Sequence, residues 1–289
     1  MVRPYAVKWR KKQDKKRKLE EKEEEEEEEE EELEDNEQKE VEEEEEEEKD
    51  EDKEVAEAAA DEIAGLPVVA RPIDGSKKKK KKGVIFVLEK ACLEVGKVGK
   101  TFQILNSDDH SNYLRKQNRN PADYRPDIIH QALLAIFDSP VTKAGRLQAV
   151  YVRTEKGVLF EIKPHVRMPR TFKRFCGLMS QLLQKLSITA VGKREKLLNV
   201  IKNPVSRHLP VDSRRIGLSY SSEKSINLVD YVANSSEDST LVFVVGAMAH
   251  GVIDKENLDD FVSICNYPLS AACCLNRICG ALEQKWNIR

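Results

Sequence analysis

The 289-residue sequence contains few aromatic side chains and no long apolar run. Phe, Trp and Tyr together make up 6% of the residues, whereas charged residues make up 35%. A membrane-spanning helix requires about 20 consecutive apolar residues, and a secretory signal peptide requires an apolar central region. The sequence offers neither, so we expect no membrane-embedded segment, no membrane partner and no secretory leader.

Paired cysteine spacings are also absent. No two of the six cysteines form a C-x-x-C pair, so the sequence lacks the usual ligand spacing of a zinc site. The pattern favours buried, reduced thiols in an intracellular protein over a disulfide framework, and we expect no bound metal. The six are Cys92, Cys176, Cys265, Cys273, Cys274 and Cys279.

The third absence is the dinucleotide-binding fingerprint G-x-G-x-x-G. Gly246 and Gly251 are separated by four residues, and they lie near the C-terminus. A Rossmann fold carries its glycines directly after the first strand. The spacing therefore disfavours a nicotinamide-dependent dehydrogenase and a methylase of the Rossmann type.

Charge is distributed very unevenly along the chain. Residues 20–54 contain 27 acidic side chains, and residues 1–82 hold 32 of the 52 acidic and 20 of the 49 basic residues. Residues 83–289 therefore carry 29 basic and 20 acidic side chains, a net charge of +9. An acidic run poor in apolar residues cannot bury enough surface to offset its ordering entropy. We predict a disordered acidic extension over 1–82 and a basic folded domain over 83–289, suited to nucleic acid.

Two clusters rich in lysine flank the acidic run, at residues 11–18 and 77–82. An accessible cationic cluster favours a nuclear-import signal; a solvated linker that balances the glutamates is the alternative. We therefore expect the protein to reside in the nucleus.

The first half of the basic domain predicts strands and one clear helix. Residues 84–88 read as a buried strand, and residues 105–125, polar and broken by a proline, read as an exposed loop. A helix begins at Pro126, because apolar residues recur at helical spacing as far as the proline at position 140. Residues 148–153 and 157–163 alternate like a hairpin.

The second half continues the alternation of helices and strands. A helix begins at Thr171, and its apolar face runs through Phe172, Phe175, Leu178, Leu182 and Leu186. We predict a short strand near residue 188, a helix over 193–201, and strands over 216–220 and 241–245. Strands that alternate with helices favour an α/β sheet with crossover connections.

The segment 241–272 predicts a binding site. The strand over 241–245 ends at Gly246, and a second apolar piece, 262–264, breaks at Asn266-Tyr267-Pro268 before a helix of small residues begins. Two strand ends that run into such turns form a concavity lined by main-chain N–H and C=O groups. A concavity of this kind suits a nucleoside-like ligand.

Arginines gather at the starts of the two predicted helices. Arg125 and Asp127 flank the first residue of one helix, where Asp127 either fixes Arg125 in direction or acts as an ordinary capping carboxylate. Arg167, Arg170 and Arg174 surround the start of the other helix, where the helix dipole disfavours cations. An anionic partner, such as RNA phosphate, would compensate for this cluster; a scattered cationic surface is the alternative.

Five ordered segments of this sequence resemble one known family. They are RPDIIHQALLAIFDSP, RMPRTFKRFCGLM, VIKNPVSRHLP, VVGAMAHG and SICNYPLSAA. From about Gly83 to the C-terminus, the chain resembles the ribosome-biogenesis methyltransferases of the nucleolar-essential-protein (Nep/Emg) family, in the SPOUT superfamily. The resemblance implies a SPOUT-type α/β sheet with a C-terminal trefoil knot, and a homodimer. It also implies a nucleolar enzyme that works with small-subunit ribosome assembly factors and methylates N1 of a pseudouridine in 18S rRNA or its precursor.

The resemblance also implies site residues. Arg125 and Asp127 would be catalytic, Arg125 by stabilising the anion that forms on the base and Asp127 by orienting Arg125; a general-base role for Asp127 is the alternative. Cys265 stands where the family carries Ser. The RNA contacts would be Arg125, Arg167, Arg170 and Arg174. The S-adenosyl-methionine contacts would be Leu218, Gly246, Gly251, Ile264, Cys265, Asn266, Tyr267, Pro268 and Leu269. A non-catalytic assembly factor that binds pre-rRNA with the same fold is the alternative function.

Overall fold

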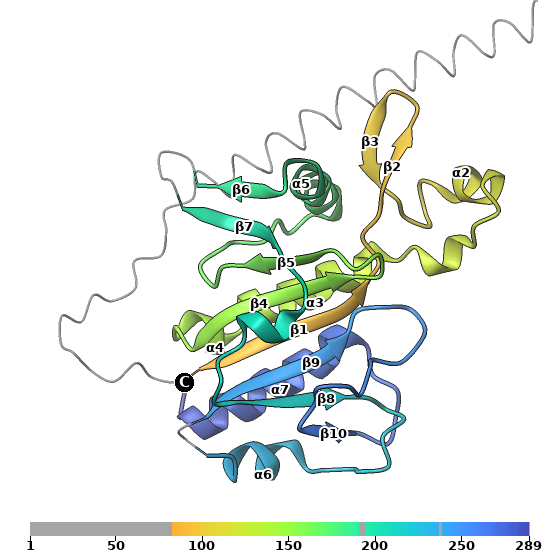
Figure 1. Ribbon diagram of the computed structural model, residues 1–289. Coiled ribbons are helices and arrows are strands. Elements are labelled where there is room, and N and C mark those ends of the chain that lie inside the picture. Colours follow the sequence, from red (N-terminus) through yellow and green to blue (C-terminus); the bar gives the residue numbers. More distant parts are fainter. Residues whose placement is uncertain (1–82, 191–194, 237–238, 289) are drawn as a thin grey trace, which may run out of the picture. The chain divides into compact units, whose positions relative to one another are not determined.

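The computed structural model describes residues 83–190, 195–236 and 239–288, and its centre is an eight-stranded mixed sheet (Figure 1). The predicted acidic extension and both lysine-rich clusters lie outside the described residues. The strands follow the order β10-β8-β9-β1-β4-β5-β7-β6. Their bounds are β1 Val84–Ala91, β4 Leu147–Thr154, β5 Leu159–Ile162, β6 Ser187–Thr189, β7 Lys196–Ile201, β8 Ser213–Leu218, β9 Thr240–Gly246 and β10 Asp260–Val262.

The sheet is parallel on one side and antiparallel on the other. Strands β10, β8, β9, β1 and β4 run parallel to one another, whereas the pairs β4–β5, β5–β7 and β7–β6 are antiparallel. From β1 the chain continues to β4 on one side and later places β9 and β8 on the other side. Such a reversal of strand order opens a crevice at the carboxyl ends of the strands, where α/β proteins bind ligands.

The three longer helices cover one face of the sheet. The longer helices are α3 Pro126–Asp138, α5 Phe172–Lys185 and α7 Ala271–Trp286. The short elements are α2 Ser111–Lys116, α4 Pro140–Lys143, α6 Leu228–Ala233 and the 3-10 turns η1 Pro121–Asp123 and η2 Val205–His208. A separate hairpin, β2 Val95–Val98 with β3 Thr101–Ile104, was not predicted from the sequence.

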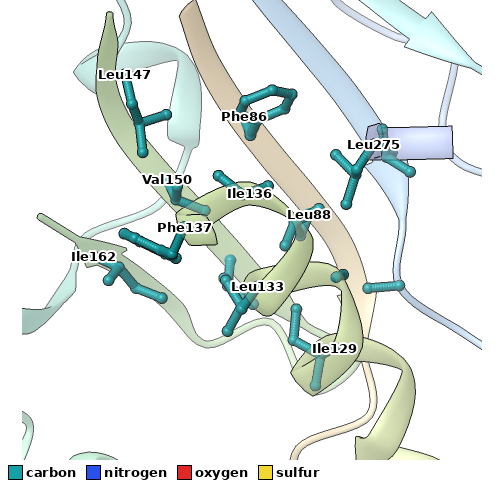
Figure 2. Packing of buried hydrophobic residues seen from close by; sticks show 14 of the residues in the cluster. Phe86, Leu88, Ile129, Leu133, Ile136, Phe137, Leu147, Val150, Ile162 and Leu275 are labelled. Carbon is teal, nitrogen blue, oxygen red and sulfur yellow. The ribbon is translucent and has the colours of Figure 1, made fainter. Parts of the chain in front are cut away.

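Strand β1 is buried on both faces, as its uninterrupted apolar sequence predicts. Phe86 and Leu88 pack against α3, whose Ile129, Leu133 and Ile136 are fully buried (Figure 2). The alternate residues of β1 belong to a second cluster on the opposite face, which the η2 segment helps to cover. None of the described helices is long and apolar enough to cross a membrane.

Three predictions of local structure are wrong. Residues 196–201 form strand β7 and not a helix, because they pair with β5 on one side and β6 on the other. Residues 105–125 are not one exposed loop, since they contain α2 and η1 and bury Asn106, His110 and Leu114. Leu186 does not extend the apolar face of α5, because it adopts a left-handed conformation at the end of the helix and its residue is 57% exposed.

Strand β10 is held from both sides. On one side it pairs with β8, and on the other it contacts the segment that connects β8 to α6. Ser222 Oγ donates to the carbonyl of Phe261 at 2.8 Å, and the Ser263 N–H donates to the carbonyl of Lys224 at 2.8 Å. The chain therefore passes between a strand and the loop that follows that same strand.

Candidate functional site

A cavity of about 400 Å³ lies at the carboxyl ends of β8, β9 and β10. Three loops surround it: the one after β8, the one after β9 and the one between β10 and α7. Its volume falls within the range of about 300–1,000 Å³ that is typical of small-molecule sites. The lining residues are Ile128, Leu218, Ser219, Tyr220, Ser221, Val245, Gly246, Met248, Ala249, Gly251, Val252, Ile253, Ser263, Ile264, Cys265, Tyr267, Leu269, Ser270, Ala271 and Cys274.

Most of the predicted cofactor residues meet at this cavity. Asn266 and Pro268 do not line it; both are exposed on the same turn. The cavity is lined by the remaining seven, Leu218, Gly246, Gly251, Ile264, Cys265, Tyr267 and Leu269.

The two predicted glycines differ in how strongly the structure requires them: the backbone requires Gly251, whereas at Gly246 an added Cβ would meet only a flexible side chain. Gly251 has a φ of +113°, a conformation that side chains with a Cβ rarely adopt. A Cβ at Gly246 would lie 2.9 Å from Cε of Met248, at the cavity wall. The loop after β9 therefore contributes both glycines to the cavity lining.

The sequence reasoning missed the serines of the site. Ser219 and Ser221 follow β8, and Ser270 caps α7 by accepting a hydrogen bond from the Cys273 N–H at 3.3 Å. Ser263 Oγ donates to the carbonyl of Cys265 at 2.9 Å, which holds the turn between β10 and α7. A signal for Ser221 was present in the sequence, because this residue directly follows the strand predicted over 216–220.

Helix α3 places the predicted catalytic pair next to a lining residue of the cavity, although neither Arg125 nor Asp127 lines the cavity itself. Ile128, in its first turn, is a lining residue; Asp127 immediately precedes it, and Arg125 is the N-cap of the helix. Arg125 Nε and Nη2 donate to the two carboxylate oxygens of Asp127 at 2.8 and 2.7 Å. The bidentate pair fixes the plane of the guanidinium group, and the Arg125 side chain remains 45% exposed.

The ion pair sets the protonation of both partners. Hydrogen bonds from Arg125 hold the pKa of the Asp127 carboxyl below its ordinary value, and the same contact raises the pKa of Arg125. A carboxylate with a lowered pKa is a weak base. The geometry thus favours the orienting role of Asp127 over the general-base role.

The other three arginines lie at the start of α5, and all three are exposed. Arg170 forms an ion pair with Asp138 at 3.2 Å, a partner that the sequence did not predict. Asp138 ends α3, whereas Arg125 precedes it. At 1.5 Å per residue, these two ends of the helix are about 20 Å apart, so the structure separates the Arg170 guanidinium from the Arg125 guanidinium.

The described part of the chain contains no cluster of side chains that could bind a metal ion. Three or more His, Cys, Asp or Glu side chains do not come together there. The six cysteines form no disulfide in the described part of the chain; Cys92, Cys274 and Cys279 are buried, and Cys273 is exposed. Burial raises the pKa of the Cys274 thiol to about 12.

The sequence of this chain matches one known protein family. The sequence model described as "EMG1/NEP1 methyltransferase" matches residues 86–283. A mouse protein named ribosomal RNA small subunit methyltransferase NEP1 is 51% identical over 205 residues, which cover 71% of this chain and 82% of the relative. The Drosophila melanogaster protein of the same name is 48% identical over 212 residues, 72% of this chain and 84% of the relative.

A solved structure shares the fold. The crystal structure of Archaeoglobus fulgidus Nep1 bound to S-adenosylhomocysteine matches 71% of this chain and 99% of its own chain, with a TM-score of 0.59 and 22% sequence identity. The family model covers most of the basic domain, and relatives near 50% identity cover more than two thirds of this chain. The chain therefore belongs to the EMG1/NEP1 methyltransferase family.

Proposed function

We propose that this protein transfers a methyl group from S-adenosyl-methionine to N1 of a pseudouridine in 18S rRNA. One observation carries the proposal: the first turn of α3 contributes Ile128 to the cavity and presents the Arg125–Asp127 pair directly before it. The names of the animal relatives, ribosomal RNA small subunit methyltransferase, support the substrate class. The S-adenosylhomocysteine of the archaeal structure supports the cofactor.

The cavity residues fit this cofactor. Leu218, Ile264 and Leu269 supply apolar walls for a planar base, and the Gly246–Gly251 loop brings main-chain groups close. Serine hydroxyls and the N-terminus of the 16-residue helix α7 supply polar partners for hydroxyl and carboxylate groups. Cys265 fits this assignment if its main-chain atoms make the contact, since its thiol replaces the serine hydroxyl expected there.

Catalysis requires alignment and charge stabilisation. S-adenosyl-methionine, when bound, supplies a methyl group that is already activated. The protein therefore needs to align the acceptor nitrogen and exclude water. Arg125 stabilises the negative charge that develops on the base as N1 releases its proton to solvent and takes up the methyl group, and Asp127 keeps the guanidinium in its plane.

The exposed arginines contact different parts of the RNA. Arg125 serves the reacting nucleotide at the cavity, while Arg167, Arg170 and Arg174 hold the phosphates of flanking nucleotides. The target base must leave its stack to enter the cavity, which a single-stranded loop of rRNA permits at low cost. The distance of about 20 Å between the two ends of α3 suits a single RNA strand that runs along this helix.

The position of β10, between β8 and the segment that follows β8, supports a trefoil knot as part of the proposal. Residues 222–226 contact β10 on the side opposite β8, so the C-terminal segment runs through the loop that joins β8 to α6. The knot would bring the three cavity loops together. The proposal has four further parts. The protein forms a homodimer, resides in the nucleolus and works with small-subunit assembly factors, and its folded domain begins after residue 82.

Mass spectrometry of 18S rRNA incubated with the protein and labelled cofactor tests the reaction. We expect one labelled N1-methylpseudouridine with the wild-type protein. Arg125→Ala should lose this product by about a hundredfold or more and retain S-adenosylhomocysteine binding by calorimetry. A wild-type protein that binds RNA and cofactor but yields no product would instead favour the non-catalytic assembly factor.

A further inference from the structure

We propose that His130 is a positioning residue for RNA, because it fixes the arginine-bearing turn of residues 167–170 to helix α3. The inference rests on the proposed function, since it assumes that this turn contacts RNA. His130 does not line the cavity and contacts neither ligand in the arrangement proposed above. Its effect would pass through the arginines on the turn.

The imidazole of His130 makes a directed contact with the turn. Its Nε2 lies 2.8 Å from the carbonyl oxygen of Pro169, and the residue is only 5% exposed. A carbonyl oxygen can only accept, so Nε2 must carry the proton and donate it. Pro169 stands between the two exposed arginines of the turn, Arg167 and Arg170.

Aromatic contacts fix the orientation of the ring. The imidazole stacks on Phe175 with a centroid separation of 4.6 Å and an interplanar angle of 25°. Phe172 lies on the same ring at 5.9 Å in a tilted arrangement. A donor held by two rings points in one direction, so the carbonyl of Pro169 has one preferred position relative to α3.

The turn is therefore attached to α3 at two points. His130 holds its main chain near the start of the helix, and Asp138 holds the Arg170 side chain at the end. The ion pair with Asp138 is exposed and contributes little by itself. The buried hydrogen bond of His130 is the contact that defines the distance between the turn and the Arg125–Asp127 pair.

Two substitutions separate the donor from the ring. His130→Phe keeps a stacking ring and removes the donor, whereas His130→Gln keeps an N–H donor and removes the ring. We expect His130→Phe to weaken binding of a single-stranded 18S rRNA oligonucleotide by about tenfold, with S-adenosylhomocysteine affinity unchanged. His130→Gln should recover part of the RNA affinity. Ile136→Val, a mild core change in the same helix, serves as the control for lost stability and should leave RNA binding intact.

A double-mutant cycle tests whether His130 acts through the arginines. In a protein that carries Arg167→Ala and Arg170→Ala, His130→Phe should cause less than about a twofold further loss of RNA affinity. A full tenfold loss in that background, or no loss in the wild-type background, would overturn the positioning role while leaving the methyltransferase proposal intact. If the double arginine variant itself binds RNA like the wild type, the proposed RNA contacts fail, and the role of His130 fails with them.

Discussion

Lys90 holds the loop after β9 by a hydrogen bond from its Nζ to the carbonyl oxygen of Val252, at 2.7 Å. Lys90 lies near the end of β1, whereas Val252 follows Gly251 in the loop after β9. An ion pair with Asp254 at 3.6 Å supports the same contact. Lys90 has a φ of +57°, a left-handed conformation that costs free energy for a residue with a Cβ. The structure thus combines backbone strain at Lys90 with a tether between β1 and the loop after β9.

The first prediction concerns this tether. Lys90→Met should weaken S-adenosylhomocysteine binding by about three- to fivefold, because the loop loses its anchor. Lys90→Gly should weaken binding equally but unfold at a higher temperature than Lys90→Met, since glycine relieves the strain. Calorimetry and thermal unfolding measure the two effects. Lys97→Met, at an exposed lysine of β2, is the control; equal cofactor affinity in Lys90→Met and the wild type would contradict the tether.

The second prediction concerns the glycine loop. Gly251→Ala should lower the free energy of unfolding by about 1–3 kcal/mol and weaken cofactor binding, because alanine strains a backbone with φ of +113°. Gly280→Ala is the matched control. An added Cβ at Gly280 meets no atom within 4 Å in helix α7, so alanine should stabilise the protein by up to about 1 kcal/mol. Unaltered cofactor affinity in Gly251→Ala would argue against this loop as the site.

The third prediction separates the two roles of Asp127. If Asp127 orients Arg125, Asp127→Asn should reduce kcat by about tenfold, because asparagine leaves the guanidinium with only one acceptor. The dependence of kcat on pH should keep its shape. If Asp127 is the general base, the loss should reach about a hundredfold or more, and the acidic limb of the profile should disappear. Rates measured across the acidic range with saturating RNA distinguish these outcomes.

The fourth prediction concerns Asp260 at the start of β10. Its carboxylate accepts hydrogen bonds from Lys224 at 2.7 Å, from the Tyr231 hydroxyl at 2.6 Å and from Arg214 at 2.6 Å. These contacts hold the pKa of the Asp260 carboxyl well below its ordinary value. They connect β10 to β8, to the loop after β8 and to α6. Asp260→Asn should therefore lower the free energy of unfolding by about 2–3 kcal/mol at neutral pH.

The pH dependence of Asp260 follows from the direction of its shift. An aspartate in the unfolded chain has a pKa of about 3.9, and the folded-state pKa is lower. The stabilisation is therefore complete above about pH 4 and declines as the pH falls toward the folded-state value. Urea unfolding should show a smaller difference between wild type and Asp260→Asn near pH 3 than at neutral pH. Asp259→Asn is the control, because its exposed ion pair with Arg215 should be worth less than about 1 kcal/mol.

The periodic segments of the chain were predictable because their pattern and their packing agree. In β1 and α3, the apolar residues that recur at strand or helix spacing are the residues that the core buries. Residues 196–201 could not be assigned in this way. Leu197, Leu198 and Val200 satisfy a short helical pattern, and only pairing with β5 and β6 makes them a strand.

The sequence by itself determined the basic domain, the strand-and-helix alternation, the glycine loop and the arginines at two helix starts, because composition, periodicity and turn chemistry are local properties. The tertiary structure decided which of these features meet. Parallel pairing of β8, β9 and β10 places Ser219, Gly251 and Leu269 around one cavity, although they lie far apart in the chain. The tertiary structure also brings Arg170 into an ion pair with Asp138, and it places His130 within hydrogen-bond distance of the carbonyl oxygen of Pro169. Such contacts depend on how helices pack on the sheet, and no spacing in the sequence encodes them.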